Sequence, residues 1–390
     1  MNDNLLPDDA EHGSLEIKIE DRAKTNEFNE DIIPKKNRKS KKLIIILIII
    51  IMAIISGIIF LIFFFLNREG ICESGENEKC KTCDIFNKCN SCNPGYKLKE
   101  GACIINYSFK AFYYTNTSNK EVNLLGEFNF RIKEMFIDGK KVEPWKKYTF
   151  ESIGSHSVLV LIDLSQTTNL ESMFFKSEMV SIYFTEKFNT EKIEDMNYMF
   201  DSCTKLTSID LSVFNTRKVL DMSGMFNECT SLKSIDLSNF NTEQVEDMYS
   251  FFCKCSSLTS IDLSNFNTKN VADMSEFFSG CNLLTSIDLS NFNTENVEDM
   301  NNMFNDCISL NFIDLSGFVN SKVTDMDSMF SNCNRLVSLN LSNFNTNEVE
   351  FMNNMFENCY SLTSLDLTSF DTQKVKDLSY MFKNCSSLMN

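Results

Sequence analysis

Residues 72–103 contain six cysteines whose spacing suits either metal binding or disulfide bonds. They are Cys72, Cys80, Cys83, Cys89, Cys92 and Cys103. Two C-x-x-C pairs would supply a zinc site, but such sites usually have a longer loop between the pairs and leave no cysteine over. An even number of cysteines in a small extracellular module is typical of disulfides. We therefore predict a neck held by disulfide bonds, whose pairing the spacing does not determine.

A second set of cysteines recurs with a 26-residue period in the C-terminal half. Its members are Cys203, Cys229, Cys255, Cys281, Cys307, Cys333, Cys359 and Cys385. An invariant period indicates that each repeat unit forms one coil of a stack. Equivalent side chains on neighbouring coils then run parallel and not toward one another, a geometry that suits a disulfide bond poorly. We expect small, buried, reduced thiols, and we assign the methionines and phenylalanines of the same period to the core. Cys253 lies outside the period.

The rest of the sequence supplies little for catalysis or cofactor binding. Only two histidines are present, His12 and His156, and they are far apart in sequence. No nucleophile–base pair, glycine-rich phosphate loop or metal-ligand cluster stands out, so we predict no enzyme activity, cofactor or metal. The formal charge of −17, from 54 acidic and 37 basic residues, argues against nucleic acid as a partner.

A column of acidic residues follows the same period and is the candidate binding face. It consists of Asp210, Asp236, Asp262, Asp288, Asp314 and Asp366, with Asn340 in the remaining coil. At a strand spacing of about 4.8 Å, neighbouring carboxylates repel by about 0.9 kcal/mol in water. The strip would attract basic protein segments or calcium; the alternative is a solvated face without a ligand. Phe312 interrupts an adjacent column of serines and is a candidate contact.

Each repeat unit contains two apolar patterns. In "LTSIDLSNF" (258–266), Ile261 and Leu263 alternate with Asp262 as in a short strand. "NT" then supplies side-chain oxygens for a helix N-cap. Val245, Met248, Phe252 and Cys255 are spaced by three, four and three residues, which predicts a helix. We therefore predict an α/β solenoid over 165–390, with a parallel sheet on one face and short helices on the other.

A membrane span is predicted between residues 43 and 66, where 24 consecutive residues carry no charge. A helix of this length is about 36 Å long, enough to cross a hydrocarbon core of about 30 Å. A cleaved signal peptide fits poorly, because the run is too long and 42 residues precede it. Six Lys and Arg residues occupy 35–42, which predicts a signal anchor with its N-terminus in the cytosol and residues 67–390 outside the plasma membrane.

The remaining segments complete the predicted domain organisation. Residues 1–42 are polar and charge-rich, as in a disordered tail. Residues 67–103 form the cysteine-rich neck, and residues 104–164 form a β-rich cap, with a hairpin turn at Asp138–Gly139. The predicted glycosylation acceptors are Asn106, Asn116, Asn340 and Asn384. Leu388 begins a strand that is not completed, so either a partner or second copy covers this coil or the sequence is truncated.

The repeated phrase "FNT-x-x-V-x-DM-x-x-MF-x-x-C-x-SL-x-SIDLS" closely resembles BspA-like leucine-rich repeat surface proteins, a group also described by a domain of unknown function common in mycoplasma lipoproteins. The resemblance implies a cell-surface solenoid used in adhesion. "CNSCNPGYKLKEGAC" (89–103) resembles EGF-like and furin-like modules. We therefore expect a single-pass surface protein whose repeats bind a protein or cell-surface ligand. The alternative is a structural coat or variable surface antigen without a specific ligand.

Overall fold

The structure is a computed structural model of the chain, and it describes residues 80–83, 89–92, 96–99, 102–105, 107–126 and 131–389. The predicted tail, membrane span, Cys72 and Asn106 lie outside these residues. The other neck cysteines are described by their backbone alone. Within the described ranges, no helix has the length and apolar character needed to cross a membrane.

Two short hairpins are described in the cysteine-rich neck. Strand β1 (Cys80–Cys83) pairs antiparallel with β2 (Cys89–Cys92), so that Cys80 is opposite Cys92 and Cys83 is opposite Cys89. Strand β3 (Tyr96–Lys99) pairs antiparallel with β4 (Ala102–Ile105). The pairing of the two C-x-x-C segments is thus a backbone ladder, and the disulfide bonds stay a prediction.

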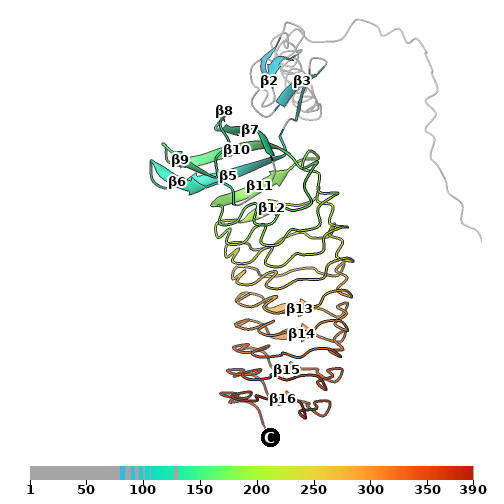
Figure 1. Cartoon of the computed structure of the whole chain (residues 1–390). Coiled ribbons are helices and arrows are strands. Elements are labelled where there is room, and N and C mark those ends of the chain that lie inside the picture. Colours follow the sequence, from blue (N-terminus) through green and yellow to red (C-terminus); the bar gives the residue numbers. More distant parts are fainter. Residues whose placement is uncertain are drawn as a thin grey trace, which may run out of the picture. The chain divides into compact units, whose positions relative to one another are not determined.

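A mixed sheet joins the segment after the neck to the first coils (Figure 1). Its strands, in spatial order, are β12 (Ser208–Asp210), β11 (Met179–Phe184), β5 (Phe109–Thr115), β10 (Gly154–Asp163), β7 (Arg131–Ile137) and β8 (Lys140–Val142). A separate ladder pairs β6 (Lys120–Asn123) with β9 (Lys147–Phe150). Because β11 pairs antiparallel with β5 and parallel with β12, it is the strand at which the cap changes into the repeat.

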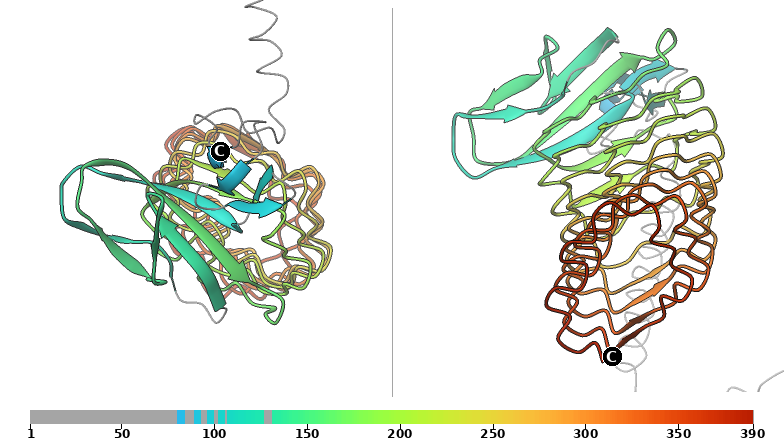
Figure 2. Two further views of the ribbon diagram at one scale, coloured as in Figure 1. Left: turned by 90° about the horizontal axis from the view of Figure 1, so that it is seen from above. Right: turned by 60° about the horizontal axis from the view of Figure 1, so that its bottom comes forward.

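Beyond β12 the chain forms one coil for each repeat unit, and successive coils lie over one another (Figure 2). The short parallel strands are β13 (Ser286–Asp288), β14 (Phe312–Asp314), β15 (Ser338–Leu339) and β16 (Ser364–Leu365). A second parallel ladder, made of single bridges, connects equivalent residues from Asn169 to Asp377. Where the strands pair, as β13 and β14 do, successive coils therefore contact each other through backbone bonds at two separate places.

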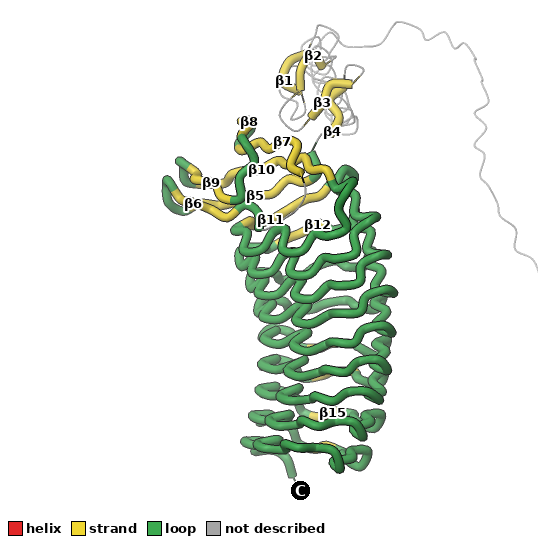
Figure 3. The backbone as a smooth tube through the Cα atoms, viewed as in Figure 1, coloured by secondary structure: helices red, strands yellow, loops and turns green. Residues whose placement is uncertain are grey.

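The predicted α/β solenoid is wrong, because the described residues contain no helix (Figure 3). The segment Val245–Cys255 is instead a series of tight turns. Ser250 and Lys254 have φ values of 53° and 56°, in the left-handed region that a right-handed helix excludes. Their equivalents from Ser172 to Asn384 share this conformation. The spacing of three, four and three residues still directs the apolar side chains inward, so it fits these turns as well as a helix.

Backbone hydrogen bonds between coils replace those of the predicted helix. The N–H groups of Met248, Ser250, Phe252 and Lys254 each donate to a carbonyl of the next coil, which for Met248 is that of Asp273. The N–H of Cys255, which follows Lys254, donates to Phe252 within the same coil. This set of four bonds repeats at every junction from Leu170 to Lys383. A coil of this kind therefore has no local regular structure without its neighbour.

Two side-chain columns add further bonds between coils and correct the predicted N-cap. The buried Thr242 hydroxyl donates to the carbonyl of Asn267 (2.9–3.0 Å in equivalent coils) and accepts the N–H of the same residue at 2.7 Å. Asn265 Nδ2 donates to the carbonyls of Leu237 and Phe240 in the preceding coil, at 3.0 and 2.8 Å. We call these the threonine spine and the asparagine spine. The threonine of each "NT" thus bonds to the next coil, not to a helix terminus.

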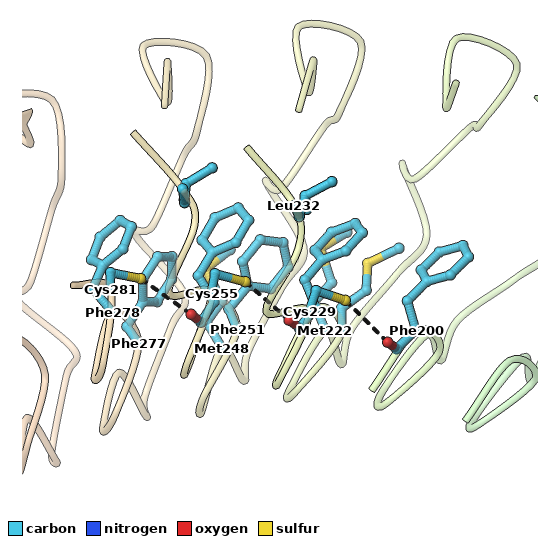
Figure 4. Close-up of a cluster of buried hydrophobic side chains, with 14 of the residues drawn as sticks. Phe200, Met222, Cys229, Leu232, Met248, Phe251, Cys255, Phe277, Phe278 and Cys281 are labelled. Atoms are coloured by element: carbon cyan, nitrogen blue, oxygen red, sulfur yellow. Dashed lines mark hydrogen bonds between the residues drawn. The ribbon is translucent and has the colours of Figure 1, made fainter. Parts of the chain in front are cut away.

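The interior between the ladders is filled by stacked columns of identical side chains (Figure 4). The rings of Phe200, Phe226 and Phe252 stack with centroids 5.5 and 5.7 Å apart. Each periodic cysteine is free, and its thiol donates to a phenylalanine carbonyl of the preceding coil, as Cys255 does to Phe226 at 3.1 Å. The thiols therefore bond to backbone and not to one another.

Replacement of Thr242 by valine tests the threonine spine. Valine has nearly the same shape but leaves the N–H and carbonyl of Asn267 without their partner, so the free energy of unfolding should fall by about 1–3 kcal/mol. Thr242→Ser retains the hydroxyl and is the matched control. Urea unfolding followed by circular dichroism measures both. Equal stability of the valine and serine variants would contradict a stabilising role for these bonds.

Candidate functional site

The six predicted aspartates lie in one column on the outer face of the stacked strands. Asp236, Asp262 and Asp288 are exposed, and each Oδ1 accepts the backbone N–H two residues further on, at 2.9–3.0 Å. These bonds, to Ser238 in the case of Asp236, lower the carboxyl pKa. We call this column the outer aspartate column. The carboxylates of Asp236, Asp262 and Asp288 are held by these bonds, and their lowered pKa keeps them ionised at neutral pH.

The negative charge of this column is not needed to form the turn that follows each strand. Asn340 occupies the equivalent position in one coil, and its Oδ1 accepts the N–H of Ser342 at 3.1 Å. An amide oxygen therefore performs the same structural task as the carboxylates. The charge repeated in the other coils is an additional property of the face.

Phe312 lies on β14 at the position that serine occupies in neighbouring coils. It pairs in register with Ser286 of β13, and its side chain is 59% exposed. Burial therefore does not account for an aromatic residue here. The structure places Phe312 and Asp314 on one face of the same strand, since alternate residues point the same way.

A second aspartate column, which the sequence analysis did not recognise as a feature, lies at the other ladder. It contains Asp195, Asp221, Asp247, Asp273, Asp299, Asp325 and Asp377, with Asn169 and Phe351 at the remaining positions. Burial raises the pKa of Asp247 and Asp325 to about 6, and it also raises that of Asp195 and Asp299. We call it the inner aspartate column. The signal in the sequence was the repeated "V-x-D-M", which lies within the segment predicted as a helix.

The other predicted sites are distributed along the chain. No three His, Cys, Asp or Glu side chains of the described residues converge as a metal-binding group. Asn116 is exposed in the connection between β5 and β6. Asn340 is exposed and accepts the hydroxyl of Ser342 at 2.8 Å, whereas Asn384 Nδ2 donates to Asn358 at 2.7 Å. In the last described coil Tyr380 is exposed, and the self-association predicted for this coil stays a prediction.

The structure also brings His156 into a polar cluster that its sequence position did not suggest. Its Nδ1 lies 2.7 Å from Asp138 Oδ2, and its Nε2 lies 3.1 Å from Thr115 Oγ1. The order Thr–His–Asp resembles a catalytic triad. However, Thr115 is fully buried and its hydroxyl donates to the carbonyl of Ser152. The cluster therefore ties the β7–β8 turn to β10 and β5, and no substrate atom can reach the hydroxyl.

Stacked coils with side-chain columns define a repeat protein in which each unit is stabilised by its neighbours. The family described as "Mycoplasma protein of unknown function, DUF285" matches residues 147–261, 252–339 and 309–390. These matches cover more than half of the chain, and the chain belongs to this family. Neither the curated proteins nor the solved structures that were searched contain a match. The family description leaves the function open.

The raised pKa values of Asp247 and Asp325 in the inner aspartate column predict that stability rises as the pH falls from 7 to 5. A carboxyl whose pKa is higher in the folded than in the unfolded state stabilises the fold most below its unfolded pKa, and this contribution is lost as the pH rises through about 6. The lowered pKa values of Asp236 and Asp262 act in the opposite direction, but below about pH 4.

Thermal unfolding at pH 5 and pH 7 measures this effect. Asp247→Asn with Asp325→Asn should raise the melting temperature at pH 7 and reduce its pH dependence, because Asn169 shows that an amide fits the column. Asp236→Asn with Asp262→Asn is the control and should leave the dependence between pH 5 and 7 unchanged. A stability that falls between pH 7 and 5 would contradict the assignment.

Burial raises the pKa of the periodic thiols, so they should resist alkylation in the folded protein. Cys385 is only half-buried, whereas Cys203 and Cys255 are fully buried. After brief treatment with N-ethylmaleimide, peptide mass spectrometry should find label on Cys385 first among Cys203–Cys385. Labelling in urea should reach all of them. Rapid native labelling of Cys255 would show that the coils open at that place.

Proposed function

We propose that the protein is a cell-surface binding protein whose stacked coils present the outer aspartate column to a protein or cell-surface ligand. The observation that carries the proposal is the charge of this column: Asn340 makes the same turn without charge, yet the other coils keep aspartate. A rigid row of exposed carboxylates favours association with basic surfaces through electrostatic complementarity. Binding measured with calcium and with EDTA also tests whether calcium bridges the column to an acidic ligand.

The proposed location follows from the sequence. Residues 43–66 would anchor the chain in the plasma membrane, with residues 1–42 in the cytosol and the neck, cap and coils outside. Disulfide bonds in the neck would suit this oxidising side. N-linked glycans would be accepted most readily at Asn116, which is exposed in a loop. The resemblance to BspA-like surface proteins supports a role in adhesion.

A charge-matched comparison tests the proposal. The full-length chain, kept in a nonionic detergent, is assayed for binding to immobilised matrix proteins, glycans and whole cells, with calcium or with EDTA. One variant changes three outer aspartates (Asp236, Asp262 and Asp288) to asparagine. The control changes three inner aspartates (Asp221, Asp247 and Asp273) to asparagine, which removes the same charge from a different column.

We expect saturable binding that weakens about tenfold in the outer-column variant, since each exposed ion pair contributes roughly 0.2–1 kcal/mol. The inner-column control should bind like the original chain. Binding that disappears with EDTA would assign the column to calcium. Equal binding by all three chains would exclude the outer aspartate column, and no binding by a folded chain would favour the passive coat protein.

A further inference from the structure

The repeat supplies an internal standard for judging which surface residues are unusual. In each coil, four positions near the short strand lie on the surface. They are the first residue of the strand and the residues one, three and four places before it. Between residues 204 and 364, the coils without the substitutions described next have Thr, Ser, Asn, Lys or Arg at these positions, apart from Tyr360, whose hydroxyl donates to Asn358. The last coil has the exposed Met389 at one of them. A departure from this polar pattern is a property of one coil and not of the fold.

Four such departures fall in three consecutive coils. They are Leu283, Ile308, Phe312 and Val337, whose exposed fractions are 50, 39, 59 and 48%. Equivalent positions elsewhere carry Ser231, Thr230, Ser260 and Thr259. Isolated apolar residues are common on protein surfaces, but a group of them has a different meaning. We call these four side chains the apolar patch.

The register of the coils places the patch residues beside one another. Phe312 is level with Ser286 in the ladder, and Leu283 lies three residues before Ser286. In the following coil, Ser338 is the residue equivalent to Phe312, and Val337 immediately precedes it. Neighbouring strands are about 4.8 Å apart and all four side chains are exposed, so three successive coils contribute apolar side chains to this part of the surface.

The coil of Phe312 also lacks contacts that most of the neighbouring coils make. Gly317 replaces the asparagine of the asparagine spine, and Asn320 replaces the threonine of the threonine spine. Asn320 is fully buried, has a φ of 55° and leaves its Nδ2 without a partner. Such an unsatisfied group lowers stability. Residues that break a stabilising sequence pattern, as Gly317 and Asn320 do, are typical of functional positions.

Charged groups border the patch. Asp288 and Asp314 lie on the strands of Ser286 and Phe312, two residues further on and therefore on the same face. A hollow of about 310 Å³ meets the patch at Ile308 and is lined also by Lys254, Gly280 and Asp306. Residues 67–390 contain 44 acidic and 28 basic residues, a net charge of −16. A ligand of this region meets apolar side chains beside Asp288 and Asp314, with Lys254 in the hollow and Arg335 two residues before Val337, in a part of the chain whose net charge is negative.

We infer that the apolar patch docks a basic polypeptide segment of a partner protein, with an aromatic or aliphatic side chain against Phe312 and Val337 and Lys or Arg facing Asp288 and Asp314. The inference rests on the proposed binding function and specifies the place and the partner class. Charge complementarity selects a basic segment, and a desolvated apolar anchor supplies the larger part of such binding energies.

Three fluorescent twelve-residue peptides serve as probes. The first has a central Trp-Leu flanked by alternating Lys and Ser, the second has Ser-Ser in place of Trp-Leu, and the third has Glu in place of Lys. The patch variant combines Phe312→Ser with Val337→Thr, which restores residues found in neighbouring coils and so should fold normally. The control combines Leu220→Ser with Phe351→Ser, which removes two exposed apolar residues outside the patch. Fluorescence anisotropy with the full-length chain in detergent gives each Kd.

The expected result is that the first peptide binds the original chain and the control at least about tenfold more tightly than the second, and that the patch variant loses this difference. The third peptide should not bind. Equal binding of the first and second peptides, lost in the outer-column variant, would overturn the docking of an anchor and leave the acidic face as the binding site. Sedimentation velocity that shows a dimer of the original chain, absent from the patch variant, would instead assign the patch to a second copy and overturn the inference.

Discussion

The structure depends on one constraint: the buried turns of each coil must find their hydrogen-bond partners in the next coil. Met248 and Phe252 are fully buried, so water cannot satisfy the backbone groups beside them. The four intercoil bonds that begin at Met248, Ser250, Phe252 and Lys254 meet this requirement. They also explain why the period of the repeat does not vary. An inserted residue would displace both ladders and both spines at once.

These bonds give the coils a direction that a β-sheet lacks. In the peptide unit that joins Asp247 and Met248, the carbonyl of Asp247 accepts a bond and the N–H of Met248 donates one. The same holds for the unit that joins Tyr249 and Ser250. Its carbonyl faces the preceding coil and its N–H faces the following coil. In a sheet, neighbouring peptide dipoles largely cancel. Here four units per coil point the same way, as they do in a helix. The resemblance to a helix thus lies in dipole alignment along the stack and not in the path of the chain.

The sequence allowed the period, the inward columns and the outward position of Asp262 to be predicted, because a periodic chain must repeat its environment once in every unit. It did not distinguish helix from turns, since both direct Met248, Phe252 and Cys255 inward. The discriminating signal is Gly280, followed by Asp306 and Asn332 at successive equivalent positions. These residue types tolerate the left-handed conformation, but Lys254 adopts it in the same column and obscures the pattern. The cluster of His156, Asp138 and Thr115 joins β10, the β7–β8 turn and β5, so no local spacing could have indicated it.

Two columns of the same amino acid have opposite electrostatic consequences. The carboxylate of Asp262 is exposed and its turn bond lowers its pKa, so its charge costs the fold little. The carboxylate of Asp247 is half-buried between like charges from Asp221 and Asp273, which adds to the effect of burial. An amide fits both places, at Asn340 and at Asn169. Geometry therefore does not require the acid in either column. The outer charge is retained where it faces solvent and a ligand can meet it, and the inner charge is retained although it opposes folding at neutral pH. The outer column is thus the better candidate for recognition, whereas Asp247 and Asp325 of the inner column are expected to make the stability of the stack depend on pH near 6.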